Sequence, residues 1–306
     1  MKVAYAKLYK DGTLVISKKR FTINPNIVKS YTIFSYWKQP WKNECKFIKK
    51  VKIESFIRIN NIAFWFENCI NLTTLIDFQN LDVSNCKDFF GVFLNCKSLI
   101  NIDSLKNWDV SNGTNFSNMF AYCESLQDLN GLENWNVSNG TDFSSMFECC
   151  ESLQNLNGLQ NWNVSNGTDF SRMFFACNSL KDLSELQTWN VSNGTNFSRM
   201  FECCESIQNI NGLTNWNVSN GTDLSYMFFC CKSLQNLNEL QNWNVSNGID
   251  FSYIFTYCKS LQKISLPDTL YILTKDMFYN CNSTLKIHWK NHTYTYEDLL
   301  EYEKIC

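Results

Sequence analysis

The sequence of 306 residues is poor in the residue types that catalysis and chain reversal most often use. It has only two histidines, His288 and His292, and only three prolines. With both histidines near one end, and with no phosphate-binding loop or nucleophile elbow, we expect no catalytic site, no metal centre and no cofactor. Because proline is so scarce, the chain must turn mostly at asparagine, serine and glycine.

Long apolar runs are absent as well. No stretch of 18 consecutive apolar residues occurs, so we expect no membrane-spanning helix. Lys2, Lys7 and Lys10 interrupt the first 20 residues, which therefore lack the apolar segment of a signal peptide. This absence favours a cytoplasmic location.

Charge is unevenly distributed, although the formal net charge is only −2. Residues 1–60 contain 14 Lys or Arg and 3 Asp or Glu, which leaves 13 basic and 26 acidic residues in the rest of the chain. We interpret the basic N-terminal region as a solvated face that protects a sheet edge. Contact with an acidic partner or acidic lipid is the alternative, and we expect no nucleic-acid partner. The densest basic cluster is Lys46, Lys49, Lys50 and Lys52.

What the sequence does contain is one pattern, Phe-x-x-Cys, repeated nine times. A pattern that recurs at a fixed period of 27 residues is typical of a solenoid, in which one small unit stacks on itself. We predict a leucine-rich-repeat-like solenoid of short parallel strands and short helical turns over residues 56–285. A basic β-hairpin cap is expected over 1–55 and a second cap over 286–306. The cysteines lie 27 residues apart, except for a last step of 23: Cys69, Cys96, Cys123, Cys150, Cys177, Cys204, Cys231, Cys258 and Cys281.

Each unit predicts the same local structure. The Leu-x-x-Leu segment at 153–156 indicates a short strand, and Met-Phe-x-x-Cys at 146–150 has the spacing of one helical turn that Ser144 could cap. Asn139-Gly140 predicts a corner with positive φ at the glycine. The columns expected in the core are Phe120, Cys123, Trp135, Phe147, Cys150, Trp162, Phe174, Cys177, Trp189, Phe201, Cys204, Trp216, Phe228, Cys231 and Trp243.

The two ends differ from the units between them. Residues 4–8 and 13–16, joined at Asp11-Gly12, have the pattern of a β-hairpin. Residues 296–302 have the pattern of a short capping helix.

These motifs resemble the BspA-like leucine-rich repeat family, in its mycoplasma-type surface variety of unknown function. The resemblance rests on Asn-Gly-Thr-Asp-Phe-Ser-Ser-Met-Phe at 139–147, with its copies at 112–120, 166–174, 193–201 and 220–228, and it covers nearly the whole chain. It implies a leucine-rich solenoid with a cell-surface or secreted, adhesin-like binding role. Where the family has Asn-Val-Thr, six copies here have Asn-Gly-Thr or Asn-Gly-Ile. Because glycine weakens a strand, we expect weak strand pairing at this Asn-Gly corner.

Three columns have both a structural and a functional interpretation. The cysteines fit a small apolar core residue better than a disulfide ladder or a zinc site at 203–204 and 230–231, because no Cys-x-x-Cys supports zinc. The tryptophans could form a core column or an exposed sugar-stacking platform, and Leu81 at the same phase favours the core. The Asn/Asp column fits turn hydrogen bonding better than a calcium ladder: Asn115, Asp142, Asp169, Asn196, Asp223 and Asp250.

Positions that vary between otherwise similar units are the candidate binding residues, because exposed arginines and aromatic rings are common binding anchors. We predict a non-catalytic, monomeric, protein-binding repeat protein. An intracellular scaffold, favoured by free thiols, and a carbohydrate-binding module, which needs exposed tryptophans, are the alternatives. One candidate strip contains Arg172, Phe175, Arg199, Tyr226, Phe229 and Tyr253, and a second contains Asp128, Asn155, Asp182, Asn209 and Asn236.

Overall fold

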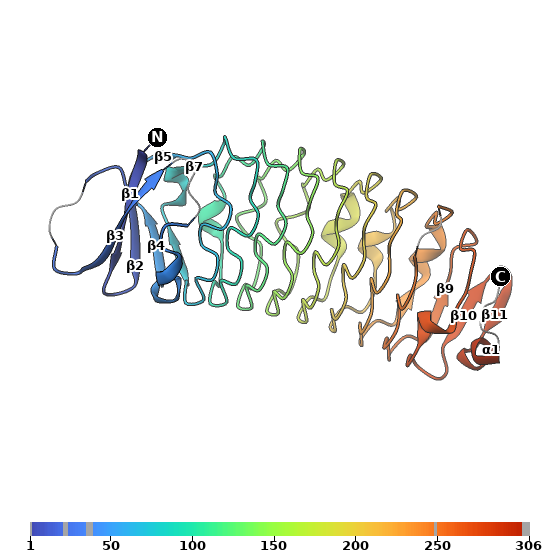
Figure 1. Cartoon of the computed structure of the whole chain (residues 1–306). Helices are drawn as coiled ribbons and strands as arrows, with labels where there is room; N and C mark the ends of the chain where they lie inside the picture. The colour runs from blue at the N-terminus through green and yellow to red at the C-terminus, as the bar shows by residue number, and fades with distance from the viewer. Residues whose placement is uncertain (1, 21–23, 35–38, 248–249, 302–306) are drawn as a thin grey trace.

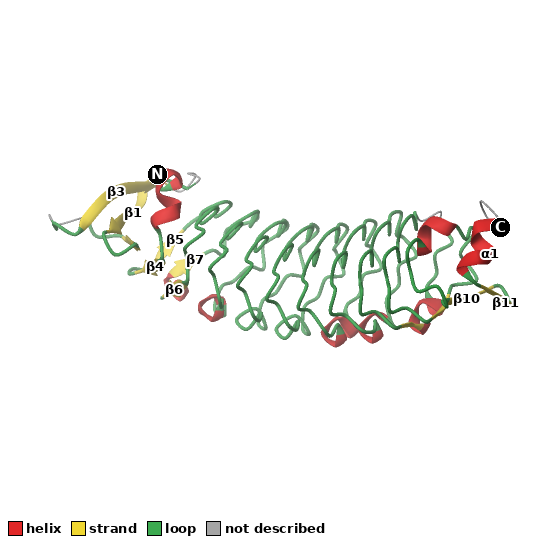
Figure 2. Ribbon diagram, turned by 90° about the horizontal axis from the view of Figure 1, so that it is seen from below, coloured by secondary structure: helices red, strands yellow, loops and turns green. Residues whose placement is uncertain are grey.

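The chain forms an elongated stack of coils, with its two termini at opposite ends of the stack (Figure 1). The computed structural model describes residues 2–20, 24–34, 39–247 and 250–301. Coils are joined side to side by bonds between residues 27 apart, such as Asn95 Nδ2 donating to Asn68 Oδ1 at 2.7 Å. Most of the stack is loop and turn, and the longer strands and the α-helix lie near its ends (Figure 2).

The N-terminal end is a five-stranded sheet in the order β3-β1-β2-β4-β6. The predicted hairpin is present, since β1 (Lys2–Tyr9) pairs antiparallel with β2 (Thr13–Ser17). On one side β1 also pairs with β3 (Ile27–Phe34), and on the other β2 pairs in parallel with β4 (Lys50–Ile53). Because β4 in turn pairs with β6 (Thr74–Ile76), the hairpin covers the sheet edge of the first coils.

The C-terminal end is a four-stranded sheet in the order β11-β10-β9-β8. Its strands are β8 (Asn236–Leu237), β9 (Lys263–Ser265), β10 (Lys286–Trp289) and β11 (His292–Tyr294). The capping helix predicted for 296–302 is present as α1 (Tyr296–Glu301), and residue 302 lies outside the described residues.

The remaining elements are short. A two-stranded parallel pair joins β5 (Ile57–Arg58) to β7 (Leu81–Asp82). Seven 3₁₀ helices occur among the described residues: η1 (Lys42–Phe47), η2 (Phe78–Asn80), η3 (Asp103–Leu105), η4 (Ser184–Thr188), η5 (Asn211–Leu213), η6 (Asn238–Asn242) and η7 (Lys275–Phe278). No helix in the described part of the chain combines the length and the apolar character that crossing a membrane requires.

The predicted strand at Leu-x-x-Leu is wrong for the central coils. From residue 83 to residue 235 the structure contains isolated parallel bridges but no extended strand. The side chain of Asn155 explains the difference, because its Oδ1 accepts a hydrogen bond from the Asn157 N–H at 3.1 Å. A side chain that binds the backbone two residues on favours a turn over an extended strand.

The bridges instead lie at the corner where the glycines predicted weak pairing. Asp142 bridges Asn115 in one neighbouring coil and Asp169 in the other. Gly140 does not adopt a positive φ, so the positive φ predicted for this glycine is also wrong. A Cβ built on Gly140 would lie 2.4 Å from Cζ of Phe143. The glycine therefore makes room for a buried ring and leaves the adjacent residues free to pair.

The helical turn predicted for 146–150 is replaced by a ribbon of successive turns. The Ser145 N–H donates to the Ser171 carbonyl in the next coil at 2.8 Å, whereas the Glu148 N–H donates back to the Ser145 carbonyl at 3.1 Å. This alternation of donors continues from residue 145 to residue 150. Ser145 and Cys149 have φ of 54° and 56°, which no right-handed helical turn contains.

Ser144 accordingly caps no helix. Its N–H and its hydroxyl both donate to Oδ1 of Asp142, at 2.9 and 2.6 Å. The same pair of bonds joins Asn115 to Ser117, and Asp169 to Ser171. The Asn/Asp column thus stabilises the start of the ribbon in successive coils.

Columns of identical side chains fill the interior. The Phe147 ring stacks between those of Phe120 and Phe174, with centroids 5.7 and 5.6 Å apart. Trp162 stacks on Trp189 at 6.3 Å, and its Nε1 donates to a backbone carbonyl 30 residues earlier at 3.0 Å. The structure buries all fifteen core candidates: Phe120, Cys123, Trp135, Phe147, Cys150, Trp162, Phe174, Cys177, Trp189, Phe201, Cys204, Trp216, Phe228, Cys231 and Trp243.

Candidate functional site

One position in the ribbon has a left-handed backbone in each of eight successive coils, with φ between 54° and 64°. Glycine adopts this conformation freely and asparagine tolerates it, whereas other residues lose about 1–2 kcal/mol. Four successive coils nevertheless place arginine or tyrosine there. The column reads Phe64, Gly91, Asn118, Ser145, Arg172, Arg199, Tyr226 and Tyr253.

The arginine side chains of this column contact carboxylates and rings that lie beside them on the stack. The guanidinium of Arg172 lies 5.3 Å from the ring centroid of Phe175, and its Nη1 lies 3.7 Å from Oε1 of Glu148. The hydroxyl of Tyr122 donates to the same carboxylate at 3.0 Å. The Glu148 side chain is 7% exposed and that of Arg172 45%, so the arginine neutralises a buried carboxylate and still faces solvent.

Arg199, one coil later, also contacts a carboxylate and a ring, but its carboxylate lies three residues on and its ring belongs to the next coil. Its Nη1 donates to Oε2 of Glu202 at 2.9 Å, and its Cζ lies 4.2 Å from the ring centroid of Tyr226. The Arg199 side chain is 34% exposed, whereas that of Glu202 is 9% exposed. Both arginines are therefore held in place by a carboxylate beneath and a ring beside them, which reduces the entropy that a partner's binding would remove.

The strip continues as a cluster of rings. Tyr226 stacks on Tyr253 with centroids 4.9 Å apart, and Phe229 lies 5.5 Å from Tyr226 and 5.4 Å from Tyr257. Tyr257 in turn lies 5.9 Å from Tyr279, whose side chain is 51% exposed. We call the whole set the arginine–tyrosine strip: Tyr122, Glu148, Arg172, Phe175, Arg199, Glu202, Tyr226, Phe229, Tyr253, Tyr257 and Tyr279.

All six residues of the first predicted strip thus belong to one of two contact groups, one around Arg172 and one from Arg199 to Tyr279. Sequence reasoning missed Tyr122, Tyr257 and Tyr279. Tyr122 and Tyr257 each immediately precede a column cysteine, where the backbone again has positive φ, at 61° and 64°. Their shared position before the cysteine was the available signal.

Burial and neighbouring carboxylates set the protonation of groups in and beside the strip. The hydrogen bond to Glu148 raises the pKa of Tyr122 to about 12, so its phenol stays a neutral donor. Burial raises the pKa of Glu202, and Arg199 opposes this shift. Burial likewise raises the pKa of Cys149 to about 11 and that of Cys203 to about 12, which keeps these thiols protonated and weakly nucleophilic.

The second predicted strip has a structural task. The Oδ1 atoms of Asp128, Asn155, Asp182 and Asn209 each accept a hydrogen bond from the backbone N–H two residues on, at 3.0–3.2 Å. The side chain of Asn236 lies outside the described residues. These oxygens stabilise the turns of the Leu-x-x-Leu segment, which limits what they could offer a partner.

The structure also places the other candidate groups. The six tryptophans from Trp108 to Trp243 are at most 4% exposed, so the exposed sugar-stacking platform is wrong. The fourteen cysteines of the described residues are free thiols. Within those residues no group of three or more His, Cys, Asp or Glu could hold a metal ion. His288 and His292 bind different partners, the Thr293 hydroxyl and the Lys290 carbonyl.

The family of this chain follows from its repeats. The model of the family described as "Mycoplasma protein of unknown function, DUF285" matches residues 41–155, 128–228 and 181–289. The chain belongs to this family, the mycoplasma-type variety of the BspA-like leucine-rich repeat proteins. No curated protein matches the chain.

Similar solved structures are leucine-rich repeat proteins from bacteria and a plant receptor. A leucine rich cell surface protein from Faecalibacterium prausnitzii A2-165 shares 14% identity over 94% of this chain and 93% of that chain, with a TM-score of 0.32. A leucine-rich repeat protein from Eubacterium ventriosum ATCC 27560 shares 14% over 91% and 93%, with a TM-score of 0.31. The plant peptide hormone receptor RGFR1 in complex with RGF2 shares 14% over 76% and 47%, with a TM-score of 0.22.

Proposed function

We propose that this protein is a non-catalytic, monomeric binding protein whose stack of coils presents the arginine–tyrosine strip to a protein partner. The observation that carries the proposal is the left-handed column. Glycine would relieve the backbone at each of its positions, yet four successive coils carry Arg172, Arg199, Tyr226 and Tyr253 there. Side chains that are retained against their conformational cost indicate a use outside folding.

The chemistry of the strip favours a partner that offers apolar or aromatic side chains. The carboxylates of Glu148 and Glu202 already neutralise the two arginines. What remains for a partner is the exposed edges of rings and the flat faces of guanidinium groups, which bind other rings well. Tyrosine and arginine are also the residues that most often dominate protein–protein affinity.

A fourfold replacement by glycine tests this function. R172G, R199G, Y226G and Y253G together keep a residue that accepts positive φ, which offsets part of the stability lost when Glu148 and Glu202 lose their arginine partners, so the chain should stay folded. Binding of the partner captured by the unchanged protein should weaken at least about a hundredfold, as expected when several anchor residues are lost. Both quantities are measurable, by urea unfolding and by surface plasmon resonance.

A matched control separates the strip from the rest of the surface. Gln127, Gln154, Gln208 and Gln235 are also exposed, one per coil, and their side chains make no hydrogen bond among the described residues. Changing these four to alanine should leave partner binding intact. Equal loss in both fourfold variants, or no loss in the glycine variant, would rule out the strip as the binding face.

We further propose that the adhesin-like role implied by the family resemblance places this binding at the cell surface. The free thiols favour a second candidate, an intracellular scaffold, because disulfides form and persist in oxidising compartments. Labelling intact source cells with a membrane-impermeant amine-reactive reagent distinguishes the two. Label on the protein before lysis supports the surface role, and label only after lysis supports the scaffold.

A further inference from the structure

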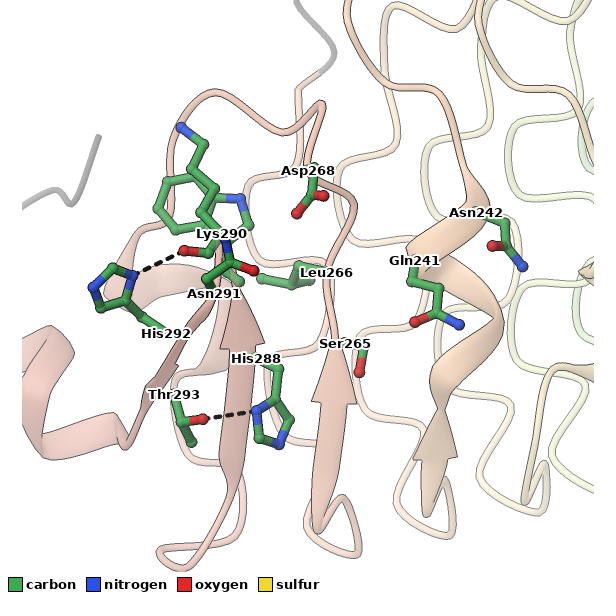
Figure 3. A pocket seen from close by; sticks show the side chains of 11 residues that line it. Gln241, Asn242, Ser265, Leu266, Asp268, His288, Lys290, Asn291, His292 and Thr293 are labelled. Carbon is green, nitrogen blue, oxygen red and sulfur yellow. Dashed lines mark hydrogen bonds between the residues drawn. The ribbon is translucent and has the colours of Figure 1, made fainter.

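A polar pocket of about 520 Å³ lies at the C-terminal end of the stack, away from the strip (Figure 3). Its floor is a row of side chains across three neighbouring strands. Ser265 of β9 pairs in register with His288 of β10, and His288 pairs with Thr293 of β11. Because paired residues share a face of a sheet, their side chains point into the same space, as Figure 3 shows.

The rim of the pocket comes from three other segments. Gln241 and Asn242 belong to η6, Asp268 follows β9, and Lys290 and Asn291 form the β10–β11 turn. Gln241, Asn242, Asp268 and Asn291 are exposed, and their side chains have no hydrogen-bond or ion-pair partner among the described residues. Four unpaired amide or carboxylate groups therefore surround one hollow.

One further group in the pocket is incompletely satisfied. The ring of His288 uses Nδ1 to bind the Thr293 hydroxyl at 2.8 Å, which leaves Nε2 without a partner in the described structure. A ligand hydroxyl on the floor of the pocket could therefore bind this nitrogen.

The charges of the lining exclude several ligand classes. Asp268 is its one carboxylate, too few for a calcium site, which takes 6–8 oxygen ligands. Lys290 is its one ammonium group, and it already lies 4.3 Å from the ring centroid of Trp289. A phosphate would meet Asp268 without a second cation to offset the repulsion. The lining is therefore nearly neutral and rich in both donors and acceptors.

We propose that this pocket binds a neutral, polyhydroxylated ligand, namely the terminal one or two sugar units of a glycan. Vicinal hydroxyls donate and accept hydrogen bonds at once, which matches amide and carboxylate groups on the rim and hydroxyl and imidazole groups on the floor. The volume lies within the range of small-molecule sites. The proposal does not depend on the strip, because no strip residue lines the pocket.

Isothermal titration of the full chain with neutral sugars tests the site. The probes are glucose, galactose, mannose, N-acetylglucosamine, lactose and chitobiose, and we expect saturable binding of at least one. The double variant Q241A/D268A should weaken that binding at least about tenfold, because it removes two side chains that we expect to form hydrogen bonds with the sugar. N291G, which preserves the turn (Asn291 has φ 66°), should weaken it as well.

The control is Y271A, because Tyr271 is 66% exposed nearby yet does not line the pocket. It should leave sugar binding unchanged, and all three variants should keep the thermal midpoint of the unchanged chain. The proposal is overturned if no sugar of the panel binds, if binding survives Q241A/D268A, or if binding requires added Ca²⁺. Binding of inorganic phosphate in place of sugar would overturn it equally.

Discussion

Two sets of ring contacts run along the same stack, one inside and one on the surface, and they differ in how strictly they repeat. Inside, the tryptophan column is identical in six coils, and neighbouring rings from Trp108 to Trp216 lie 6.2–6.5 Å apart. On the surface, the left-handed column changes from Gly91 through Asn118 and Arg172 to Tyr226. Both follow the same period, so the period alone does not distinguish folding from binding.

The difference has a physical cause. A buried ring must fit the ring of the next coil on both sides, so any change leaves a cavity or a clash. A surface ring meets solvent on one side, and the fold accepts many residues there. The fold accepts many residue types in the left-handed column, yet the chain has arginine and tyrosine there, which are unfavourable at positive φ. Packing alone therefore does not explain these residues.

The largest expected effect breaks the interior column. Trp162→Ala removes a ring that stacks on both neighbours and a buried hydrogen bond to the Leu132 carbonyl. We expect the free energy of unfolding to fall by about 3–5 kcal/mol. Tyr226→Ala, on the strip, should lower it by less than about 1 kcal/mol. Urea unfolding followed by circular dichroism measures both.

Equal destabilisation by these two changes would remove the distinction between the columns. A second outcome would sharpen it. Because each coil contacts only its neighbours, Trp162→Ala could also split unfolding into two transitions, one for each side of the altered coil. Such a split would show that the interior column couples the coils, which Tyr226→Ala should not disturb.

The next effect compares two glycines with positive φ. Gly158 has φ 108°, and a Cβ there would lie 2.4 Å from the Leu129 carbonyl oxygen. Gly158→Ala should therefore cost about 1–3 kcal/mol. Gly91 belongs to the strip column, has φ 58°, and a Cβ there would have its nearest contact at 3.4 Å. Gly91→Ala should cost about 1 kcal/mol at most, because the column accommodates side chains in other coils.

The same urea titrations decide this comparison. A Gly91→Ala variant as unstable as Gly158→Ala would mean that side chains in the strip column are severely strained. A Gly158→Ala variant as stable as the unchanged chain would mean that the close carbonyl moves away easily. The first result would change the energy assigned to the left-handed column.

Sequence reasoning was reliable where side-chain burial alone decides the structure. The phase of Trp162 and Phe147 places both in the core, and alternation around Asp11-Gly12 gave the hairpin. It failed where backbone conformation depends on the neighbouring coil. Nothing in the residue types of Arg172 or Tyr226 indicates positive φ, because hydrogen bonds to the adjacent coil impose that conformation. Only Gly91 and Asn118, at the same phase, hinted at it.

The candidate site shows the same division. The strip residues could be found from variation between coils, but their contacts could not, since Tyr226 meets Tyr253 from a different coil. The C-terminal pocket could not be found at all. It unites residues from η6 and β9 with the β10–β11 hairpin, and the hairpin lies beyond the last, 23-residue step of the pattern.

The smallest expected effect concerns pH and the carboxylate beneath Arg199. Burial raises the pKa of Glu202 above its ordinary value near 4.5, although Arg199 and Arg172 oppose the shift and Glu148 adds to it. The folded chain then binds this proton more tightly than the unfolded chain does. As pH rises from 4.5 through the raised pKa, this group's contribution to stability is lost, by less than about 1 kcal/mol for a pair whose arginine faces solvent.

Glu202→Gln removes that titration and leaves the other carboxyl groups in place. Asp11, Glu44 and Asp82 have lowered pKa values, so their contributions are lost as pH falls, in the opposite direction. The difference between the two stability curves from pH 4 to pH 8 isolates Glu202: the unchanged chain should lose stability relative to the variant as pH rises. A difference that grows in the opposite direction would mean that the ion pair with Arg199 outweighs burial. The strip would then be anchored by charge, and breaking that pair would be the better test of its binding role.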